Sequence, residues 1–148
     1  MDAGRLAEIE RESFPAEQCF TPRRIRGLLE NPRALVHVAE RDGVVAGWVV
    51  SLVRTHQRWR TGRLYGIAVS PTMSGRGIGR ILVTRTLEEL TRRGVVSVAL
   101  EVQSDNERAI GLYRSFGFTQ AAYLPDYYGA GVPGIRMLRG SATPAVSR

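Results

Sequence analysis

The sequence predicts an α/β domain built on one mixed, mostly antiparallel sheet with helices on both faces. Two observations predict it: an early pair of helical segments leads into three apolar runs that form an antiparallel meander, and strand and helix patterns then alternate to the C-terminus. The 148 residues, 43% of them hydrophobic, suffice for one core. We expect a single domain over residues 1–139 and a flexible tail over 140–148.

Two helices are predicted in the N-terminal part. Apolar residues at helical spacing among acidic ones indicate a first helix that ends near Pro15. Thr21 and Pro22 have the residue types of an N-cap and a first helical position, so a second helix should run from there to about Glu30.

The meander follows these helices. Residues 34–40 and 44–54 are predicted strands, and the Asp42-Gly43 pair between them is a signal for a tight hairpin turn. Residues 63–70 form a third predicted strand, in which Gly66 indicates a β-bulge.

Residues 54–63 hold four arginines, His56 and Trp59, and we predict that they form the loop of a hairpin. A solvated loop is the favoured interpretation, because charged runs are common on exposed loops. The alternative is that these arginines, with Trp59, bind an acidic acceptor or RNA. The net charge of +7 favours an anionic partner. The chain has no lysine, which indicates a codon bias toward arginine, so the charge alone is weak support for nucleic acid.

The second half of the chain alternates strands and helices. A helix should end near Arg93, with Gly94 just beyond it as a typical C-terminal residue. The other predicted elements are a strand at 95–102, a short helix capped by Asp105 or Asn106 and ended by Gly117, and strands at 118–123 and 135–138.

A glycine-rich stretch precedes the first of these helices and predicts a pyrophosphate-binding loop. Glycine lets the backbone N–H groups close on a ligand, and the following helix N-terminus adds further donors. The spacing fits neither the lysine-containing P-loop nor the G-x-G-x-x-G dinucleotide motif. The alternative is a glycine-rich turn with solvated arginines. The residues of the loop are Ser74, Gly75, Arg76, Gly77, Ile78, Gly79 and Arg80.

Further motifs accompany this loop in a fixed order: Ile67-Ala68-Val69, Leu100-Glu101-Val102, Asn106, Leu112-Tyr113 and Gly117-Phe118. Over residues 34–139 the chain thereby resembles the Gcn5-related N-acetyltransferase (GNAT) superfamily, above all its enzymes that acetylate ribosomal-protein alanines and other protein N-termini. The resemblance implies acetyl-CoA as cosubstrate, a primary amine as acceptor and direct transfer in a ternary complex. It also implies a sheet whose central strands splay into a V.

The resemblance assigns site residues. Glu101 is implied as the general base and Tyr113 as the general acid, with the Val69 N–H as oxyanion donor. From the residues alone, Glu101 could be a solvated strand-end carboxylate and Tyr113 a core aromatic. The implied cofactor-binding residues are Ile67, Ala68, Val69, the seven residues of the loop, Asn106 and Tyr113.

The acceptor is implied less sharply. Tyr127 and Tyr128 resemble the segment that binds the acceptor N-terminus, but the acidic residues that often follow its glycine are absent here. A protein or peptide N-terminal α-amine is favoured, and a lysine side chain or a polyamine-like small amine is the alternative. In the glycine-rich loop, Ser74 stands where this family usually has Gln or Arg. A non-catalytic acyl-CoA sensor or an RNA-associated module remains the alternative of another class.

The cysteine and histidine content and the hydropathy of the chain bear on its metal content and its location. One cysteine excludes an intramolecular disulfide, and two isolated histidines do not form a metal site. No apolar run reaches the ~20 residues that cross a bilayer, and the N-terminus lacks a signal-peptide pattern. We therefore expect a cytoplasmic protein, either a monomer or a homodimer, with no membrane partner.

Overall fold

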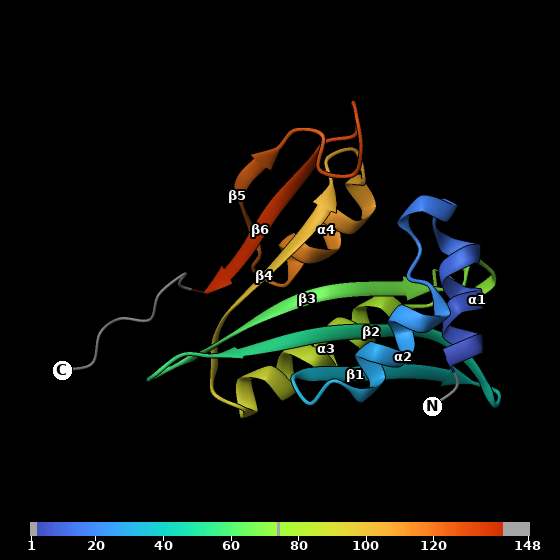
Figure 1. Cartoon of the computed structure of the whole chain (residues 1–148), viewed down its shortest axis with the longest axis horizontal. Coiled ribbons are helices and arrows are strands. Elements are labelled where there is room, and N and C mark those ends of the chain that lie inside the picture. Colours follow the sequence, from blue (N-terminus) through green and yellow to red (C-terminus); the bar gives the residue numbers. More distant parts are fainter. Residues whose placement is uncertain (1–2, 74, 141–148) are drawn as a thin grey trace.

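A computed structural model describes residues 3–73 and 75–140, so Ser74 and most of the predicted tail lie outside the described residues. One sheet carries helices on both faces, as predicted (Figure 1). The elements are α1 (Ala3–Ser13), η1 (Ala16–Gln18), α2 (Pro22–Glu30), β1 (Ala34–Arg41), β2 (Val44–Thr55), β3 (Arg60–Val69), η2 (Pro71–Met73), α3 (Ile78–Arg92), β4 (Val95–Gln103), α4 (Glu107–Ser115), β5 (Thr119–Leu124) and β6 (Gly134–Gly140).

The strands lie in the order β1-β2-β3-β4-β6-β5. Neighbours are antiparallel except β3 and β4, which are parallel. This confirms the mixed, mostly antiparallel sheet. None of the helices in the described part of the chain is long and apolar enough to cross a membrane.

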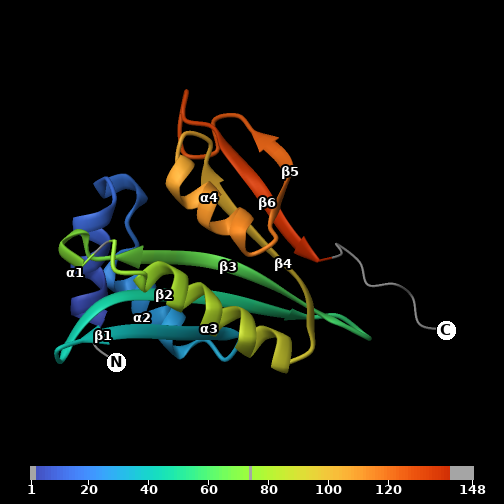
Figure 2. The same cartoon turned by 180° about the vertical axis from the view of Figure 1, so that it is seen from behind.

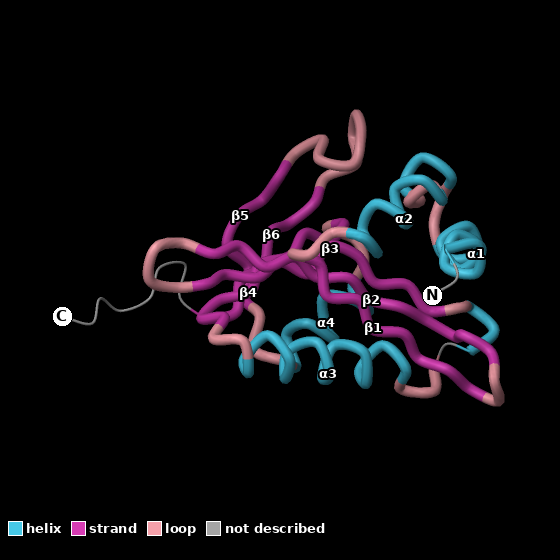
Figure 3. Tube along the Cα trace, turned by 60° about the horizontal axis from the view of Figure 1, so that its bottom comes forward, coloured by secondary structure: helices cyan, strands magenta, loops and turns pink. Residues whose placement is uncertain are grey.

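Helices α1 and α2 cover one face of the sheet, over β1, β2 and β3 (Figure 3). Leu6, Ile9 and Ile25 are fully buried there against Trp48. The predicted cap of α2 is confirmed: the Thr21 hydroxyl accepts a hydrogen bond from the Arg24 N–H at 3.1 Å.

Helices α3 and α4 cover the opposite face, where the larger core lies (Figure 2). Val83 and Leu90 of α3 are buried in this core, whereas Gly79, near the start of the helix, is only half-buried. Asn106, rather than Asp105, caps α4, because its side chain accepts a hydrogen bond from the Ala109 N–H at 3.2 Å.

The predicted hairpin turn at Asp42-Gly43 is confirmed, with positive φ at both residues. The predicted loop over 54–63 is wrong: β2 continues to Thr55 and β3 begins at Arg60. Alternating strand positions can hold long arginine side chains on a half-exposed sheet without breaking the ladder. Only residues 56–59 form the turn, which is closed by a hydrogen bond from the His56 N–H to the Trp59 carbonyl at 2.7 Å.

The central strands separate into the predicted V. Val50 lies opposite Gly66 and Ser51 opposite Leu64, so one extra residue is inserted in β3, which confirms the predicted bulge. The pairing of β3 with β4 stops at Leu64 and Leu100. Beyond this point β3 follows β2 and β4 follows β6, and the two strands diverge (Figure 1). Backbone groups along the inner edges of the V therefore have no strand partner and can bind a ligand.

Candidate active site

A groove of about 580 Å³ opens at the V, between the end of β3, the glycine-rich loop and α4. Nearly all the predicted cofactor-binding residues border it. Ser74 lies outside the described residues, and Arg76 is exposed without lining the groove. The lining residues are Ser13, Phe14, Ile67, Ala68, Val69, Gly75, Gly77, Ile78, Gly79, Arg80, Asn106, Arg108, Ala109, Gly111, Leu112 and Tyr113.

The glycine-rich loop has the backbone that its sequence predicts. Gly75 and Gly77 have φ angles of 82° and 74°, in the left-handed region that residues with a Cβ rarely adopt. Gly77 is the N-cap of α3 and offers no side chain to its first turn. The first N–H groups of this 15-residue helix therefore point out of the helix end without an internal partner. They can bind an anion there.

Arg80 is fixed by contacts between α3 and α4. Its guanidinium donates to the Ser115 hydroxyl at 3.2 Å and lies 5.2 Å from the centre of the Phe116 ring. Arg108 of α4 also lines the groove and was not predicted from the sequence. Two arginines on different helices thus border the groove, which suits a ligand with several phosphates.

Tyr113 lies on α4 at the wall of the groove and is buried. Its ring packs edge-on against Phe118, with 5.9 Å between the ring centres. Burial raises the pKa of Tyr113 to about 12. Among the described residues none forms a hydrogen bond with its hydroxyl. At neutral pH the phenol is therefore protonated and can donate to a ligand.

Glu101 lies on β4 just beyond the last pair with β3, and its side chain is only 6% exposed. Both carboxylate oxygens are bound: one accepts from Arg63 of β3, the other from the Arg136 Nε at 2.8 Å. The burial excludes a solvated strand-end glutamate. The two arginine contacts were not predicted, although Arg136 stands out in the sequence as a charge between the buried Ile135 and Met137.

Tyr127 and Tyr128 lie in the turn between β5 and β6, with 4.9 Å between their ring centres. The Arg63 guanidinium donates to the Tyr127 hydroxyl at 3.3 Å, so the turn and the Glu101 carboxylate share one arginine. Gly134 makes room for Tyr128: a Cβ there would lie 2.8 Å from the tyrosine Cε2 and 3.2 Å from the Val102 carbonyl oxygen.

The predicted acid, base and acceptor residues come together around Tyr128. Burial raises the pKa of Tyr128 well above its ordinary value. The charges that also act on it are those of Tyr127, Glu101 and Tyr113, which raise it, and of Arg63, which lowers it. Arg63 and Tyr128 lie more than 60 positions apart in the sequence. Their charges nevertheless act on each other where the strands separate.

A buried carboxylate in α1 fixes the other side of the site. Glu10, only 1% exposed, accepts hydrogen bonds from the Phe20 N–H at 3.1 Å and the Trp48 Nε1–H at 3.2 Å. Desolvation raises its pKa, against the opposing effect of these two bonds. Phe20 in turn stacks on Tyr65 of the β3 bulge at 5.4 Å. Glu10 was not predicted, although it occupies a core position in the helical spacing of Leu6 and Ile9.

Ser13 is a further contact that the sequence did not reveal. Its hydroxyl donates to the Val69 carbonyl at 3.0 Å, and both residues line the groove. The contact holds the end of α1 to the end of β3. The bulge of β3 is centred on residues 64–66. Val69, the predicted oxyanion donor, lies beyond it.

Comparison with known proteins identifies the family. Residues 4–118 match the profile of the acetyltransferase (GNAT) family. A ribosomal protein bS18-alanine N-acetyltransferase of Salmonella typhimurium is 46% identical over 65 residues, which is 44% of each protein. The match therefore spans less than half of that relative. An N-alpha-acetyltransferase RimI of Mycobacterium tuberculosis is 35% identical over 147 residues, covering 97% of this chain and 90% of the relative.

A solved structure agrees with these matches. The crystal structure of the ribosomal-protein-S18-alanine N-acetyltransferase from Escherichia coli superposes with a TM-score of 0.82 at 25% identity, over 97% of this chain and 90% of that one. The splayed sheet, the glycine-rich loop at the start of α3 and the family profile over most of the chain agree with one another. The chain belongs to the acetyltransferase (GNAT) family.

Proposed function

We propose that this acetyltransferase transfers the acetyl group of acetyl-CoA directly to the N-terminal α-amine of a protein or peptide. The observation that carries the proposal is the Arg63 guanidinium, which joins Glu101 to the tyrosines of the β5–β6 turn where β3 and β4 separate, while Tyr113 lines the groove at the V. The names of the relatives, which describe alanine and α-amino acetylation of proteins, support this acceptor.

The groove at the V fits the donor. Its end at Gly75 and Gly77 offers backbone N–H groups and a helix N-terminus for a pyrophosphate, and Arg80 and Arg108 supply positive charge. The unpaired inner edge of β3 suits the amide groups of a pantetheine arm. When bound, acetyl-CoA supplies the thioester carbon that the amine attacks, and we assign the Val69 N–H to the developing oxyanion.

Glu101 serves as the base. An α-amine has an ordinary pKa near ~8, so part of it is already neutral at physiological pH. The guanidinium groups of Arg63 and Arg136 favour the neutral amine further, because like charges nearby disfavour the ammonium form. Glu101 then takes the proton that the amine loses as the C–N bond forms.

Tyr113 serves as the acid. Collapse of the tetrahedral intermediate breaks the C–S bond and releases a thiolate, which needs a proton. Tyr113 lines the groove, has a phenol that is protonated at neutral pH, and has a hydroxyl that no described residue engages. The cycle closes when Glu101 releases its proton to solvent and the tyrosinate takes one up from solvent.

A mass-spectrometric assay tests the acceptor. The enzyme is mixed with acetyl-CoA and peptides that have a free N-terminus and no lysine, or a blocked N-terminus and one lysine. We expect acetylation of the first set, with one CoA thiol released per acetyl group. Acetylation of lysine peptides or polyamines alone would contradict the proposal. Binding of acetyl-CoA without acceptor-dependent thiol release would instead indicate an acyl-CoA sensor.

The proposal includes a place of action. An enzyme that acetylates ribosomal or other newly made proteins needs acetyl-CoA and free N-termini in one compartment. We therefore propose that it acts in the cytoplasm, in keeping with the ribosomal-protein acceptors in the names of its relatives.

A further inference from the structure

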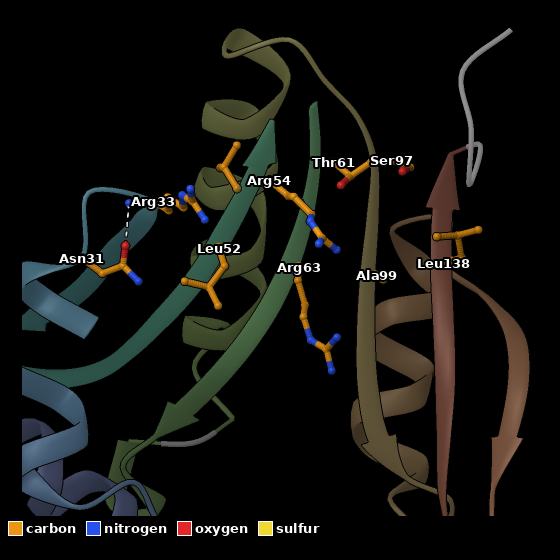
Figure 4. Close-up of a pocket in the computed structure, with 11 residues that line it drawn as sticks. Asn31, Arg33, Leu52, Arg54, Thr61, Arg63, Ser97, Ala99 and Leu138 are labelled. Atoms are coloured by element: carbon orange, nitrogen blue, oxygen red, sulfur yellow. Dashed lines mark hydrogen bonds between the residues drawn. The ribbon is translucent and has the colours of Figure 1, made fainter. Parts of the chain in front are cut away.

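A second groove, of about 550 Å³, lies between the α2–β1 loop and β6. Thr61 of β3 and Ser97 and Ala99 of β4 lie along it, and Leu138 closes one side (Figure 4). Ser97 and Ala99 alternate with the buried Val98 and Leu100, so they face the same side of the sheet as Glu101.

The groove is positively charged. Arg33, Arg54 and Arg63 line it, and none of its lining residues is acidic. Among the described residues no carboxylate forms an ion pair with Arg33 or Arg54. The Nε of Arg63 is buried there without a hydrogen-bond partner within the described chain. The charge of the groove is therefore available to an anionic ligand.

Arg63 links the groove to the proposed catalytic site. Arg63 lines it and also contacts Glu101 and Tyr127. From Glu101 back to Ser97 is four residues along β4, or about 13 Å at ~3.3 Å per residue. An extended peptide that starts at Glu101 therefore reaches Ser97 and Arg54 with about its fourth or fifth residue.

We propose that this groove binds an acidic segment within about the first five residues of the acceptor, and so selects N-termini followed by Asp or Glu. The inference rests on the proposed function. A peptide is favoured over RNA because Leu52, Val53 and Leu138 form part of the lining. Such apolar contacts suit the carbon atoms of side chains, whereas a nucleic-acid backbone carries a charge at every nucleotide.

Paired peptides test the inference. They share length and the first two residues, carry Glu or Gln at positions three to five, and bear a C-terminal dye. Fluorescence anisotropy in the presence of CoA gives Kd, and initial rates give kcat/KM. We expect the Glu peptide to be about tenfold better by both measures. Arg33→Gln and Arg54→Gln should each reduce this preference about two- to fivefold, the range for exposed ion pairs.

Two controls sharpen the experiment. Arg85→Gln removes the same charge from the exposed surface of α3, on the other face of the sheet, and should leave the preference unchanged. Arg54→Glu should shift the preference toward a peptide with Lys at positions three to five. Equal results with Glu and Gln peptides, or an equal effect of Arg85→Gln, would overturn the inference.

The outcomes separate the two proposals. N-terminal acetylation without any preference for acidic peptides overturns the groove assignment and leaves the proposed function intact. Acidic peptides that bind through Arg33 and Arg54 but are never acetylated overturn the proposed function alone. If Arg54→Gln weakens binding of a single-stranded RNA oligonucleotide and not of the acidic peptide, the groove is a nucleic-acid site and the inference is wrong.

Discussion

Glu101 shows how far the surroundings of a residue define its chemistry. Its position at the end of an apolar strand is visible in the sequence, but its two guanidinium partners come from β3 and β6. These contacts hold the carboxylate at the V and place two positive charges beside it, where we propose that the amine binds. One acidic residue thus becomes part of a three-residue group, which in the proposed mechanism orients the base and favours a neutral amine.

Replacing the base should slow the chemical step. In Glu101→Gln the side chain keeps its size but cannot take up a proton, so kcat should fall at least about tenfold. The loss should shrink as the pH rises, because more of the amine is then already neutral. Initial rates across pH 6.5 to 9.5 measure this. Acetyl-CoA binding, followed by calorimetry, should persist, and the exposed Glu88→Gln is the matched control.

Removing the phenol should affect the leaving group. In Tyr113→Phe the buried ring remains but the proton donor is lost, so kcat should fall about tenfold or more with acetyl-CoA binding retained. Tyr123→Phe removes a hydroxyl from an exposed tyrosine of β5 and should have no effect. Wild-type rates in Tyr113→Phe would show that another group or water protonates the thiolate.

Glu10 is a structural residue whose loss should destabilise the fold. Glu10→Ala leaves the partly buried Phe20 N–H and the buried Trp48 Nε1–H without acceptors, at a cost of about 3 kcal/mol in the free energy of unfolding. Urea unfolding measures this loss, and Glu8→Ala, on the exposed side of α1, is the control. A change below about 0.5 kcal/mol in Glu10→Ala would mean that water replaces the carboxylate.

At the scale of elements, two connections frame the site from opposite sides. The α1–α2 segment is held by Glu10 and stacks through Phe20 on the β3 bulge. The β5–β6 turn is closed by two backbone hydrogen bonds, from the Tyr128 N–H to the Val132 carbonyl and from the Val132 N–H to the Gly129 carbonyl, both at 3.0 Å. Since both are anchored to the sheet next to the V, they can hold an acceptor N-terminus against Glu101 while the glycine-rich loop holds the donor.

A small change beneath the β5–β6 turn should separate acceptor binding from donor binding. In Gly134→Ala the new Cβ would meet the Tyr128 ring and the backbone oxygen of Val102, so the ring must move. We expect KM for peptide to rise about tenfold with little change in acetyl-CoA affinity. Gly27→Ala in α2, where a Cβ meets nothing within 4 Å, is the control. An unchanged peptide KM would exclude Tyr128 from acceptor binding.

At the scale of the whole molecule, the sheet brings distant segments together and sets how stability responds to pH. His37 of β1 faces α3, where its ring nitrogen lies 3.3 Å from the Thr86 hydroxyl. Burial, with a contribution from the charge of Arg93, lowers the pKa of His37 below its ordinary value of 6.5. The unfolded chain therefore binds this proton at a higher pH than the folded protein does.

This difference predicts a loss of stability in mild acid. The free energy of unfolding should fall as the pH drops below about 6.5, and the contribution of His37 should level off once the folded protein is protonated as well. Urea unfolding from pH 7.5 to 5 measures the slope, and His37→Gln should flatten it. His56→Gln, in the β2–β3 turn, is the control. An equal slope in His37→Gln would assign the effect to other groups.

Local patterns were enough for most of the fold. Turn residues, helix caps and alternating apolar residues located the four α-helices and the six strands of the described residues, because these signals act between residues close in the chain. The short 3-10 helices η1 and η2 were not predicted. The 54–63 segment was the main error: its arginines look like an exposed loop, yet six of its ten residues belong to β2 and β3. Backbone pairing with neighbouring strands outweighed the composition there.

The tertiary structure alone decided how the site is assembled. Chain patterns and a family resemblance identified the glycine-rich loop, Glu101 and Tyr113, since each lies within a recognisable local motif. No local pattern links Glu101 to Arg63 and Arg136, Glu10 to Trp48, or Arg33 to Arg54, because each pair meets only when the strands take their order in the sheet. The glycine-rich loop can therefore be recognised in the sequence, whereas the groove that we propose for the acceptor, with its charge, forms only in the folded sheet.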